Sequence, residues 1–308
     1  MLKKLQKSLL GVGAIAAVVI VASLVYFHTK FSASPGSEGN SQIIRIHDDK
    51  LLLVTSFYPL YYFVEQIAGE RAIVINLTPN GVEPHDYEPS PREIAEAGSA
   101  SAVFILGHSF EPWAGSLPRE IAVQILDDFS ATTSDPHIWL DPISATKIVN
   151  RIADHLEKID PAGSSTYEEN KKTLVAELAK LDSEYVSALQ DCSLRDIVTS
   201  HSAFGHLASR YGLNQISLAG LSPDAEPSAQ KLAQIATLAK SRGIKYIFSE
   251  SLVNPQFSQV VASEAGVQTL VLNPLEGLTE SDVIQGKDYF TVMRENLTNL
   301  TLALQCKK

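Results

Sequence analysis

The sequence predicts an α/β fold of two similar α/β lobes, each with a mainly parallel four-stranded sheet, joined by one long rigid helix. Short β-branched runs alternate with helix-like segments, which is typical of βα units in a parallel sheet. Four such runs lie in each half of the chain. A long stretch between the halves has the period of a helix and contains neither proline nor glycine.

The expected strands follow one another at similar spacing in both halves. In the first half they cover residues 51–56, 72–77, 102–106 and 123–126. In the second half they cover residues 196–199, 215–218, 246–249 and 269–272. Four strands in each half indicate two lobes of the same architecture, although the sequence contains no strong residue-level repeat.

Residues 166–190 form the predicted connecting helix. Apolar side chains recur there in steps of three and four residues, as in an amphipathic helix, at Leu174, Leu178, Leu181, Tyr185 and Leu189. At about 1.5 Å per residue, this stretch spans roughly 37 Å, which is enough to bridge two lobes and to limit hinge opening. A break at residues 160–163 (DPAG) precedes it.

These signals divide the chain into five parts. They are an N-terminal membrane anchor or signal segment at residues 1–30, a flexible tether at 31–49, an N-terminal lobe at 50–162, a linking helix at 163–190 and a C-terminal lobe at 191–308.

The N-terminal segment is directed to a membrane. Residues 9–27 carry no charge, and lysines precede them, which places the N-terminus in the cytoplasm and the rest of the chain outside. Two interpretations stand, a cleaved signal peptide and an uncleaved anchor. The anchor is favoured because the apolar core exceeds the ~7–15 residues usual in signal peptides and no Ala-x-Ala site follows. We therefore expect an extracytoplasmic protein anchored to the membrane.

The only two cysteines are Cys192 and Cys306. Neither lies near the N-terminal segment, so the sequence does not predict a lipoprotein. In an oxidising compartment an even number of cysteines favours a disulfide, here one that holds the C-terminal helix to the lobe beginning near Asp191. Two unpaired thiols are the alternative.

The charge balance excludes nucleic acid as a partner. The chain has 25 basic and 35 acidic residues and a net charge of −10, and the first thirty residues hold four of the lysines and no acid. An acidic surface without a basic patch repels phosphate backbones. A cationic or small neutral ligand fits better.

Three of the eight histidines lie in or beside loops with strongly shaped sequences. His85 follows the second strand, His201 follows the first strand of the second half, and His137 lies in a Pro- and Trp-containing segment. Ligands collect at the carboxyl ends of strands in open α/β sheets, so these loops can meet in one cleft. Three imidazoles and one carboxylate would form a transition-metal site there.

Four motifs resemble the zinc/manganese solute-binding proteins of bacterial ABC transporters, the ZnuA/TroA-like group. They are residues 84–91 (PHDYEPSP), 137–142 (HIWLDP), 200–207 (SHSAFGHL) and 272–278 (LNPLEGL). The resemblance runs from about Leu51 to Cys306. It implies two α/β lobes on one long helix with the metal between them.

The resemblance implies the metal ligands His85, His137 and His201, with Glu276 as the fourth. Many members carry Asp where this chain has Asn273, so the fourth ligand falls to the glutamate of the 272–278 segment. Glu250, at the end of the strand 246–249, and a water molecule are the alternatives.

The ligand types favour Zn²⁺ over Mn²⁺. Manganese prefers oxygen-rich sites, and manganese-binding members of the group tend to have a carboxylate at the position of His201. The resemblance thus implies a monomeric extracytoplasmic zinc receptor that delivers Zn²⁺ to an ABC permease, and no enzymatic activity. A manganese receptor and a metal-binding adhesin of the same fold are alternatives. A secreted zinc hydrolase is another, but the chain has no His-Glu-x-x-His helix and no Gly-x-Ser-x-Gly elbow.

Other polar and aromatic residues near these motifs have simpler expected roles. We expect His206 to pack and His108, at the end of a strand, not to bind metal, and we expect Trp139 to form a wall beside His137. Asp141 and Glu88 either orient imidazoles or cap helices.

Overall fold

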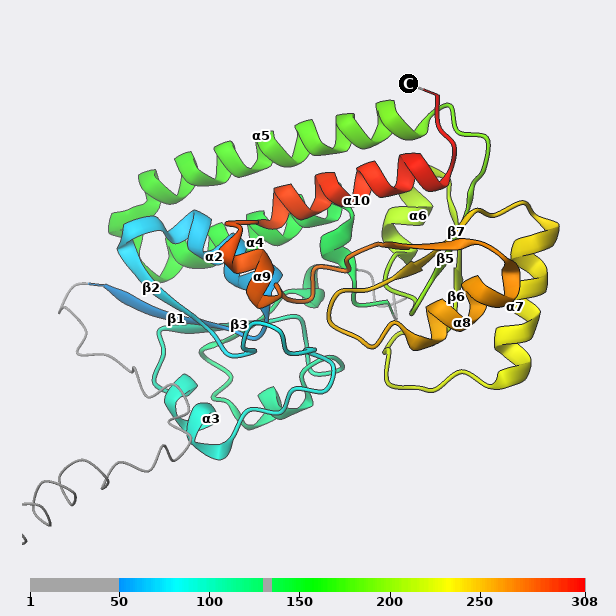
Figure 1. The fold of residues 1–308 in the computed structure, drawn as a ribbon. Helices are drawn as coiled ribbons and strands as arrows, with labels where there is room; N and C mark the ends of the chain where they lie inside the picture. The colour runs from blue at the N-terminus through cyan, green and yellow to red at the C-terminus, as the bar shows by residue number, and fades with distance from the viewer. Residues whose placement is uncertain (1–49, 130–134, 308) are drawn as a thin grey trace, which may run out of the picture. The chain divides into compact units, whose positions relative to one another are not determined.

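The N-terminal lobe is built on a parallel sheet with the strand order β2-β1-β3-β4. The computed structural model describes residues 50–129 and 135–307 of the chain (Figure 1). The strands of this sheet are β1 (Leu51–Thr55), β2 (Ala72–Asn76), β3 (Ala102–Ile105) and β4 (Ala122–Gln124). The helices α2 (Tyr58–Ala68) and α3 (Pro91–Ala97) connect them, with short 3-10 turns at Gly69–Arg71, Pro112–Ser116 and Leu126–Asp128.

The C-terminal lobe repeats this arrangement with the order β6-β5-β7-β8, again with parallel pairing. Its strands are β5 (Asp196–Thr199), β6 (Asn214–Ser217), β7 (Tyr246–Ser249) and β8 (Gln268–Val271). Its helices are α6 (Gly205–Tyr211), α7 (Ala229–Ser241), α8 (Gln256–Ala265) and α9 (Glu280–Ile284). The eight predicted strands are confirmed to within two residues at either end, and so is the predicted fold class.

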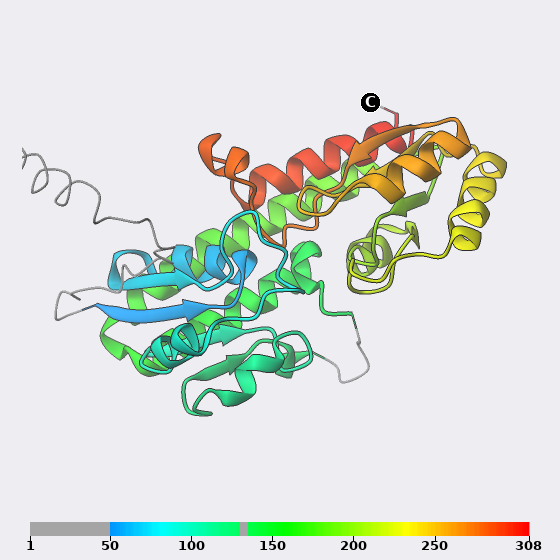
Figure 2. The ribbon, with the colours of Figure 1, turned by 60° about the horizontal axis from the view of Figure 1, so that its bottom comes forward.

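Two long helices connect the sheets in sequence. They are α4 (Pro142–Ile159) and α5 (Ser164–Leu189), with a 3-10 turn at Pro161–Gly163 between them. The predicted helix at 166–190 is thus confirmed as α5, and its five predicted apolar positions are buried. Helix α5 contacts α2 and α4 near one end and α6 and α10 (Tyr289–Ala303) near the other. Figures 1 and 2 both show α10 running beside α5.

One hydrophobic core extends across both sheets. It contains Leu53 and Phe104 from the first sheet, Ile197 and Phe248 from the second, and Tyr185 of α5, all almost fully buried. Neighbouring strand residues point to the opposite faces, where smaller clusters lie under the outer helices, as expected for strands covered on both sides. The described residues all belong to one compact unit. The boundaries at residues 162 and 190 stay a prediction.

The predicted disulfide between Cys192 and Cys306 is confirmed. It joins the chain just after α5 to the chain just after α10. Backbone hydrogen bonds from Leu194 N to Leu304 O and from Lys307 N to Asp191 O run beside it.

The predicted anchor and tether lie outside the described residues. Between residues 50 and 307, as far as the structure describes them, no helix is long and apolar enough to cross a membrane.

Candidate metal centre

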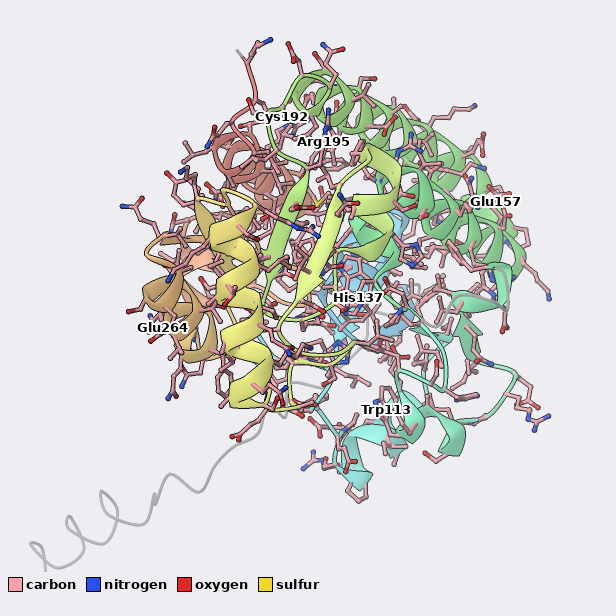
Figure 3. All side chains as sticks on the ribbon, turned by 90° about the vertical axis from the view of Figure 1, so that its right-hand side faces the viewer. Trp113, His137, Glu157, Cys192, Arg195 and Glu264 are labelled. Carbon is pink, nitrogen blue, oxygen red and sulfur yellow. A yellow bond between two sulfur atoms is a disulfide. The ribbon has the colours of Figure 1, made fainter. Side chains whose placement is uncertain are left out.

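Four side chains from four separate segments meet between the two sheets. His85 lies in the loop after β2, and His137 precedes the 3-10 turn Ile138–Leu140 that leads into α4. His201 comes two residues after β5, and Glu276 lies between β8 and α9. These are the four residues that the sequence analysis singled out, and the structure brings all of them together. Figure 3 shows His137 surrounded by other side chains, in contrast to Glu157 and Glu264 near the outline.

The three imidazoles present the same nitrogen to a common centre. His137 Nε2 lies 3.3 Å from His85 Nε2 and 3.3 Å from His201 Nε2. Glu276 Oε1 lies 3.1 Å from Nε2 of His85, 3.1 Å from that of His137 and 3.4 Å from that of His201. One carboxylate oxygen therefore closes a group of three nitrogens.

These distances fit a tetrahedral metal ion. A regular tetrahedron whose corners lie about 2.0–2.1 Å from its centre, as in zinc–imidazole and zinc–carboxylate bonds, has edges of about 3.3–3.4 Å. Five of the six edges of this group measure between 3.1 and 3.4 Å. Such close packing of donor atoms is unfavourable without a cation or protons between them, so the group fits a small divalent metal.

The electrostatics of the group favour positive charge. The side chains of His137, His201 and Glu276 are fully buried, and that of His85 is 10% exposed. Burial alone lowers the pKa of His201, but hydrogen bonds to Glu250 and Glu276 outweigh it and raise the pKa to about 10. Burial alone raises the pKa of Glu276, but hydrogen bonds from the imidazoles outweigh burial. The pKa of Glu276 therefore lies well below its ordinary value. A cation among these groups is thus stabilised by nearby carboxylates.

Two further carboxylates orient two of the imidazoles. Asp135 Oδ1 lies 2.7 Å from Nδ1 of His137, and Glu250 Oε1 lies 2.8 Å from Nδ1 of His201. When Nδ1 donates to a carboxylate, Nε2 keeps its lone pair and faces the common centre. Glu250 therefore binds the outer nitrogen of His201 and does not belong to the inner group, where it had been an alternative to Glu276.

Glu83 lies against both His85 and Glu276. Its Oε1 accepts a hydrogen bond from the backbone N–H of His85 at 3.0 Å. While both carboxyls are ionised, Glu83 Oε2 and Glu276 Oε2 are buried without a hydrogen-bond partner among the described residues. A proton on Glu83 relieves this conflict. Burial and the neighbouring Glu276 carboxylate raise the pKa of Glu83 to about 9.

The segment that carries Glu276 is held by asparagines. Asn296 of α10 accepts from the N–H of Asn273 at 2.8 Å and donates to its carbonyl at 2.7 Å. Asn273 Oδ1 accepts from Leu275 N, where the backbone has a φ of 58°. A buried leucine in this left-handed region is strained, and the surrounding hydrogen bonds maintain the turn that directs Glu276 inward.

The remaining residues considered in the sequence analysis lie outside the group of four donor side chains. His108 is exposed, while His206 Nε2 contacts the carbonyl of Asp135. Trp139 is fully buried against His137, as expected of a wall, and donates from Nε1 to the carbonyl of Pro274. Of the two roles considered for Asp141, the structure has the helix cap, since its carboxylate accepts from the first N–H groups of α4. Glu88 is exposed.

Sequence reasoning missed Asp135 and Glu83 as contacts of the site. Each accepts a hydrogen bond from the backbone N–H two residues further on, at His137 and His85 respectively. For Asp135 this is the Asx turn that an Asp-Pro-His sequence favours. An acidic residue two positions before a candidate histidine was therefore the sequence signal for these contacts.

Two parallel sheets of the same strand order, with a buried group of three imidazoles and one carboxylate between them, define a two-lobe metal-binding protein. Residues 53–303 match the family described as zinc-uptake complex component A periplasmic (ZnuA). The chain belongs to this family.

Curated relatives share about a third of the sequence. Zinc-binding protein AdcA of Streptococcus pyogenes serotype M1 is 35% identical over 289 residues, which cover 83% of this chain and 56% of that protein. High-affinity zinc uptake system protein ZnuA of Bacillus subtilis is 35% identical over 284 residues, 84% of this chain and 89% of that protein. The chain thus spans about half the length of the AdcA relatives it matches.

Solved structures share the fold. The Zn(II)-bound ZnuA-like domain of Streptococcus pneumoniae AdcA is 38% identical with a TM-score of 0.74, covering 83% of this chain and 99% of that one. The laminin binding protein Lmb of Streptococcus agalactiae, described as a bifunctional protein with adhesin and metal transporting activity, is 30% identical with a TM-score of 0.76, covering 82% and 99%.

Proposed function

We propose that this chain is an extracytoplasmic receptor that captures Zn²⁺ and delivers it to an ABC permease for uptake. Its metal ligands are Nε2 of His85, His137 and His201 and Oε1 of Glu276. The observation that carries this proposal is the set of distances of 3.1–3.4 Å among these four atoms, which are the edges of a zinc-sized tetrahedron. Membership of the zinc-uptake family supports it.

Zinc is preferred to manganese because of the donor atoms. Three imidazole nitrogens and one carboxylate oxygen suit Zn²⁺, whereas Mn²⁺ favours sites rich in oxygen. The AdcA domain that is 38% identical to this chain was solved with Zn(II) bound. Zinc is here the cargo of the protein.

A binding role is preferred to hydrolysis. Catalytic zinc sites keep one position open for water beside three protein ligands. In this site Glu276 Oε1 lies within 3.4 Å of all three Nε2 atoms and fills the fourth position. The relatives named for zinc binding and zinc uptake agree with a receptor.

The receptor works as a monomer at the outer face of the membrane. Residues 1–30 anchor it in the membrane, and residues 31–49 form a flexible tether. The lobes at 50–162 and 191–308, joined by the helix at 163–190, hold the metal between them. The permease is its partner, and an acidic chain of net charge −10 suits a cationic cargo.

Zinc uptake by cells tests this proposal. In a strain that lacks this chain, re-expression of the full chain should restore accumulation of radioactive zinc from zinc-poor medium. His137→Ala should fail to do so at equal protein level, while the exposed His108→Ala should restore uptake fully. Uptake supported equally by His137→Ala would contradict the proposal, as would wild-type chain that restores none.

A further inference from the structure

The start of α6, in the C-terminal lobe, touches Asp135, in the N-terminal lobe. His206 Nε2 lies 3.0 Å from the carbonyl oxygen of Asp135 and 3.9 Å from its Oδ2. The two residues are 71 positions apart in sequence. One helix therefore joins the segment that follows His201 to the segment that precedes His137.

Gly205 lets the Asp135 carboxylate approach α6 closely. A Cβ atom added at Gly205 would lie 2.5 Å from Asp135 Oδ2, and its next contacts would be at 3.7 Å or more. Any side chain at position 205 thus displaces this carboxylate and little else. The glycine is not needed for its backbone angles, because the described glycines with positive φ do not include it.

The other oxygen of the same carboxylate holds His137. Asp135 Oδ1 accepts from the backbone N–H of His137 at 3.0 Å and lies 2.7 Å from its Nδ1. With Nδ1 engaged, the ring is fixed and Nε2 faces the three other donor atoms. A shift of Asp135 Oδ2 rotates the carboxylate and breaks this arrangement.

The matching pair at His201 is built differently. Glu250 is 6% exposed and follows strand β7, and both of its oxygens lie within 2.9 Å of His201 Nδ1. The Asp135 side chain is 21% exposed and lies at the end of none of the described strands, so its position depends on what packs against it. Among the described residues, Gly205 and His206 provide this support.

We propose that Gly205 and His206 are positioning residues of the zinc site. By their close contact with Asp135 they hold His137 in the tautomer and orientation that present Nε2 to the metal, and they couple the His201 segment to His137. The inference rests on the proposed zinc function. Loss of a carboxylate that orients a ligating histidine typically costs about 10–100-fold in metal affinity.

Gly205→Ala separates positioning from stability. Alanine in the first turn of a helix favours folding at least as much as glycine does. We therefore expect a melting temperature of the metal-free protein equal to or above that of the wild type, together with a dissociation constant for zinc raised by about 10–100-fold. Gly115→Ala is the matched control, because a Cβ atom there meets nothing within 4 Å.

Two further readouts link the effect to Asp135. Long-range ¹⁵N–¹H NMR of the metal-free full chain should show His137 protonated on Nδ1 in the wild type and a mixture of tautomers in Gly205→Ala. His206→Ala should weaken zinc binding, and His206→Gln, which keeps a donor, should restore it in part. In an Asp135→Ala background neither Gly205→Ala nor His206→Ala should weaken zinc binding further.

Several results would overturn the proposal. One is a Gly205→Ala variant with the zinc affinity and the His137 tautomer of the wild type. Another is a loss of zinc affinity from Gly205→Ala that is equally large in the presence and in the absence of the Asp135 side chain. A third is a loss of zinc affinity that occurs only in variants with a lowered melting temperature. If the wild type binds no zinc, the proposed function fails, whereas the tautomer of His137 in metal-free protein still reports whether Gly205 and His206 position it.

Discussion

The three histidines of the site differ in what holds their outer nitrogens. His201 has the buried Glu250, His137 has Asp135, and His85 is fixed through its backbone by Glu83 and packs edge-on against Phe110. His85 is also the member of the group with solvent exposure. The two carboxylate-backed imidazoles therefore form the most rigid part of the site.

Glu250→Gln tests this role of the carboxylate. A glutamine has one neutral carbonyl oxygen and an NH₂ group in place of two carboxylate oxygens, so it holds the Nδ1–H of His201 less firmly and can, with its NH₂ group turned inward, donate to Nδ1 instead. The preference of His201 for presenting Nε2 is then weaker. We expect the dissociation constant for zinc to rise by about 10–100-fold, measured by competition with a chelator. Glu264→Gln, at an exposed position on α8, should leave it unchanged. Equal affinities of both variants would show that Glu250 does not orient His201.

Glu111 is a buried carboxyl outside the metal site. It accepts hydrogen bonds from Ser56 Oγ, Leu106 N and Gly107 N, yet burial outweighs these bonds and raises its pKa from 4.5 to about 7. Because the folded protein then holds this proton more tightly than the unfolded chain, the stability from this group is complete below about pH 4.5 and is lost as the pH rises through 7.

The free energy of unfolding of metal-free protein should therefore fall with rising pH more steeply in the wild type than in Glu111→Gln. Between pH 4.5 and 7.5 the free energy of unfolding, measured by urea denaturation, should fall by about 3 kcal/mol more in the wild type than in the variant. Titrating histidines contribute equally to both proteins and cancel. Parallel curves would mean that Glu111 is ionised in the folded protein throughout this range.

At this scale the sequence predicts ligands better than it predicts their supports. His85, His137, His201 and Glu276 stand in motifs that resemble a known family, and the structure brings them together. For the supports, the sequence indicates Asp141 and Glu88 only as candidates, with helix capping as an equal alternative, because acidic residues beside the motifs all look alike in sequence. Only the folded chain shows that Asp135 reaches Nδ1 of His137.

The conformation of the segment between β8 and α9 depends on one residue of helix α10, Asn296. Asn296 is 1% exposed and makes both of its hydrogen bonds to the backbone of Asn273, three residues before Glu276. The sequence contains no signal for this contact, since the two residues are 23 positions apart.

Asn296→Ala should destabilise the protein by about 2–3 kcal/mol, because it leaves a buried N–H and a buried C=O without partners. It should also weaken zinc binding, since the turn at Leu275 loses its support. Asn299→Ala on the same helix is the control, because Asn299 is only half-buried and its side chain donates one hydrogen bond, to Val271 O. Thermal melting and zinc titration measure both effects, and similar losses in the two variants would contradict this role of Asn296.

The strands and α5 were predictable because their signals are local. Apolar runs of four to six residues define each strand, and a period of 3.6 defines the helix. Helix α6 begins at Gly205, four residues after His201, and the N–H of Ser202 in the turn before it donates to the carbonyl of Gly220.

For the molecule as a whole, the two sheets share one hydrophobic core and one helix. Helix α5 has 26 residues and contacts elements of both lobes. Tyr185 of α5 donates to Met293 O of α10, and Arg294 pairs with Glu184. A core continuous across the lobes opposes wide opening, as a rigid connecting helix predicts. The sequence indicated the helix but not the shared core, which arises from residues far apart in the chain.

The disulfide between Cys192 and Cys306 joins the chain after α5 to the chain after α10 and stabilises the packing of these two helices. It closes a segment of 114 residues, and a cross-link over such a length stabilises a protein by about 2–5 kcal/mol, mainly by restricting the unfolded chain. Cys192→Ser with Cys306→Ser should lower the free energy of unfolding by this amount and leave zinc affinity nearly unchanged. A reductant should destabilise the wild type by the same amount and should leave the stability of the variant unchanged. Wild-type stability in the variant would contradict this role.

The most direct test of the central claim is calorimetric titration of the full chain and its variants with zinc. If the four side chains bind the metal as proposed, the wild type binds one zinc ion per chain. Since four-ligand sites bind zinc with roughly 10–16 kcal/mol, His85→Ala, His137→Ala, His201→Ala and Glu276→Ala should each raise the dissociation constant about 100-fold or more. His108→Ala should bind as the wild type does. Unchanged zinc binding in His137→Ala or in Glu276→Ala would contradict the claim.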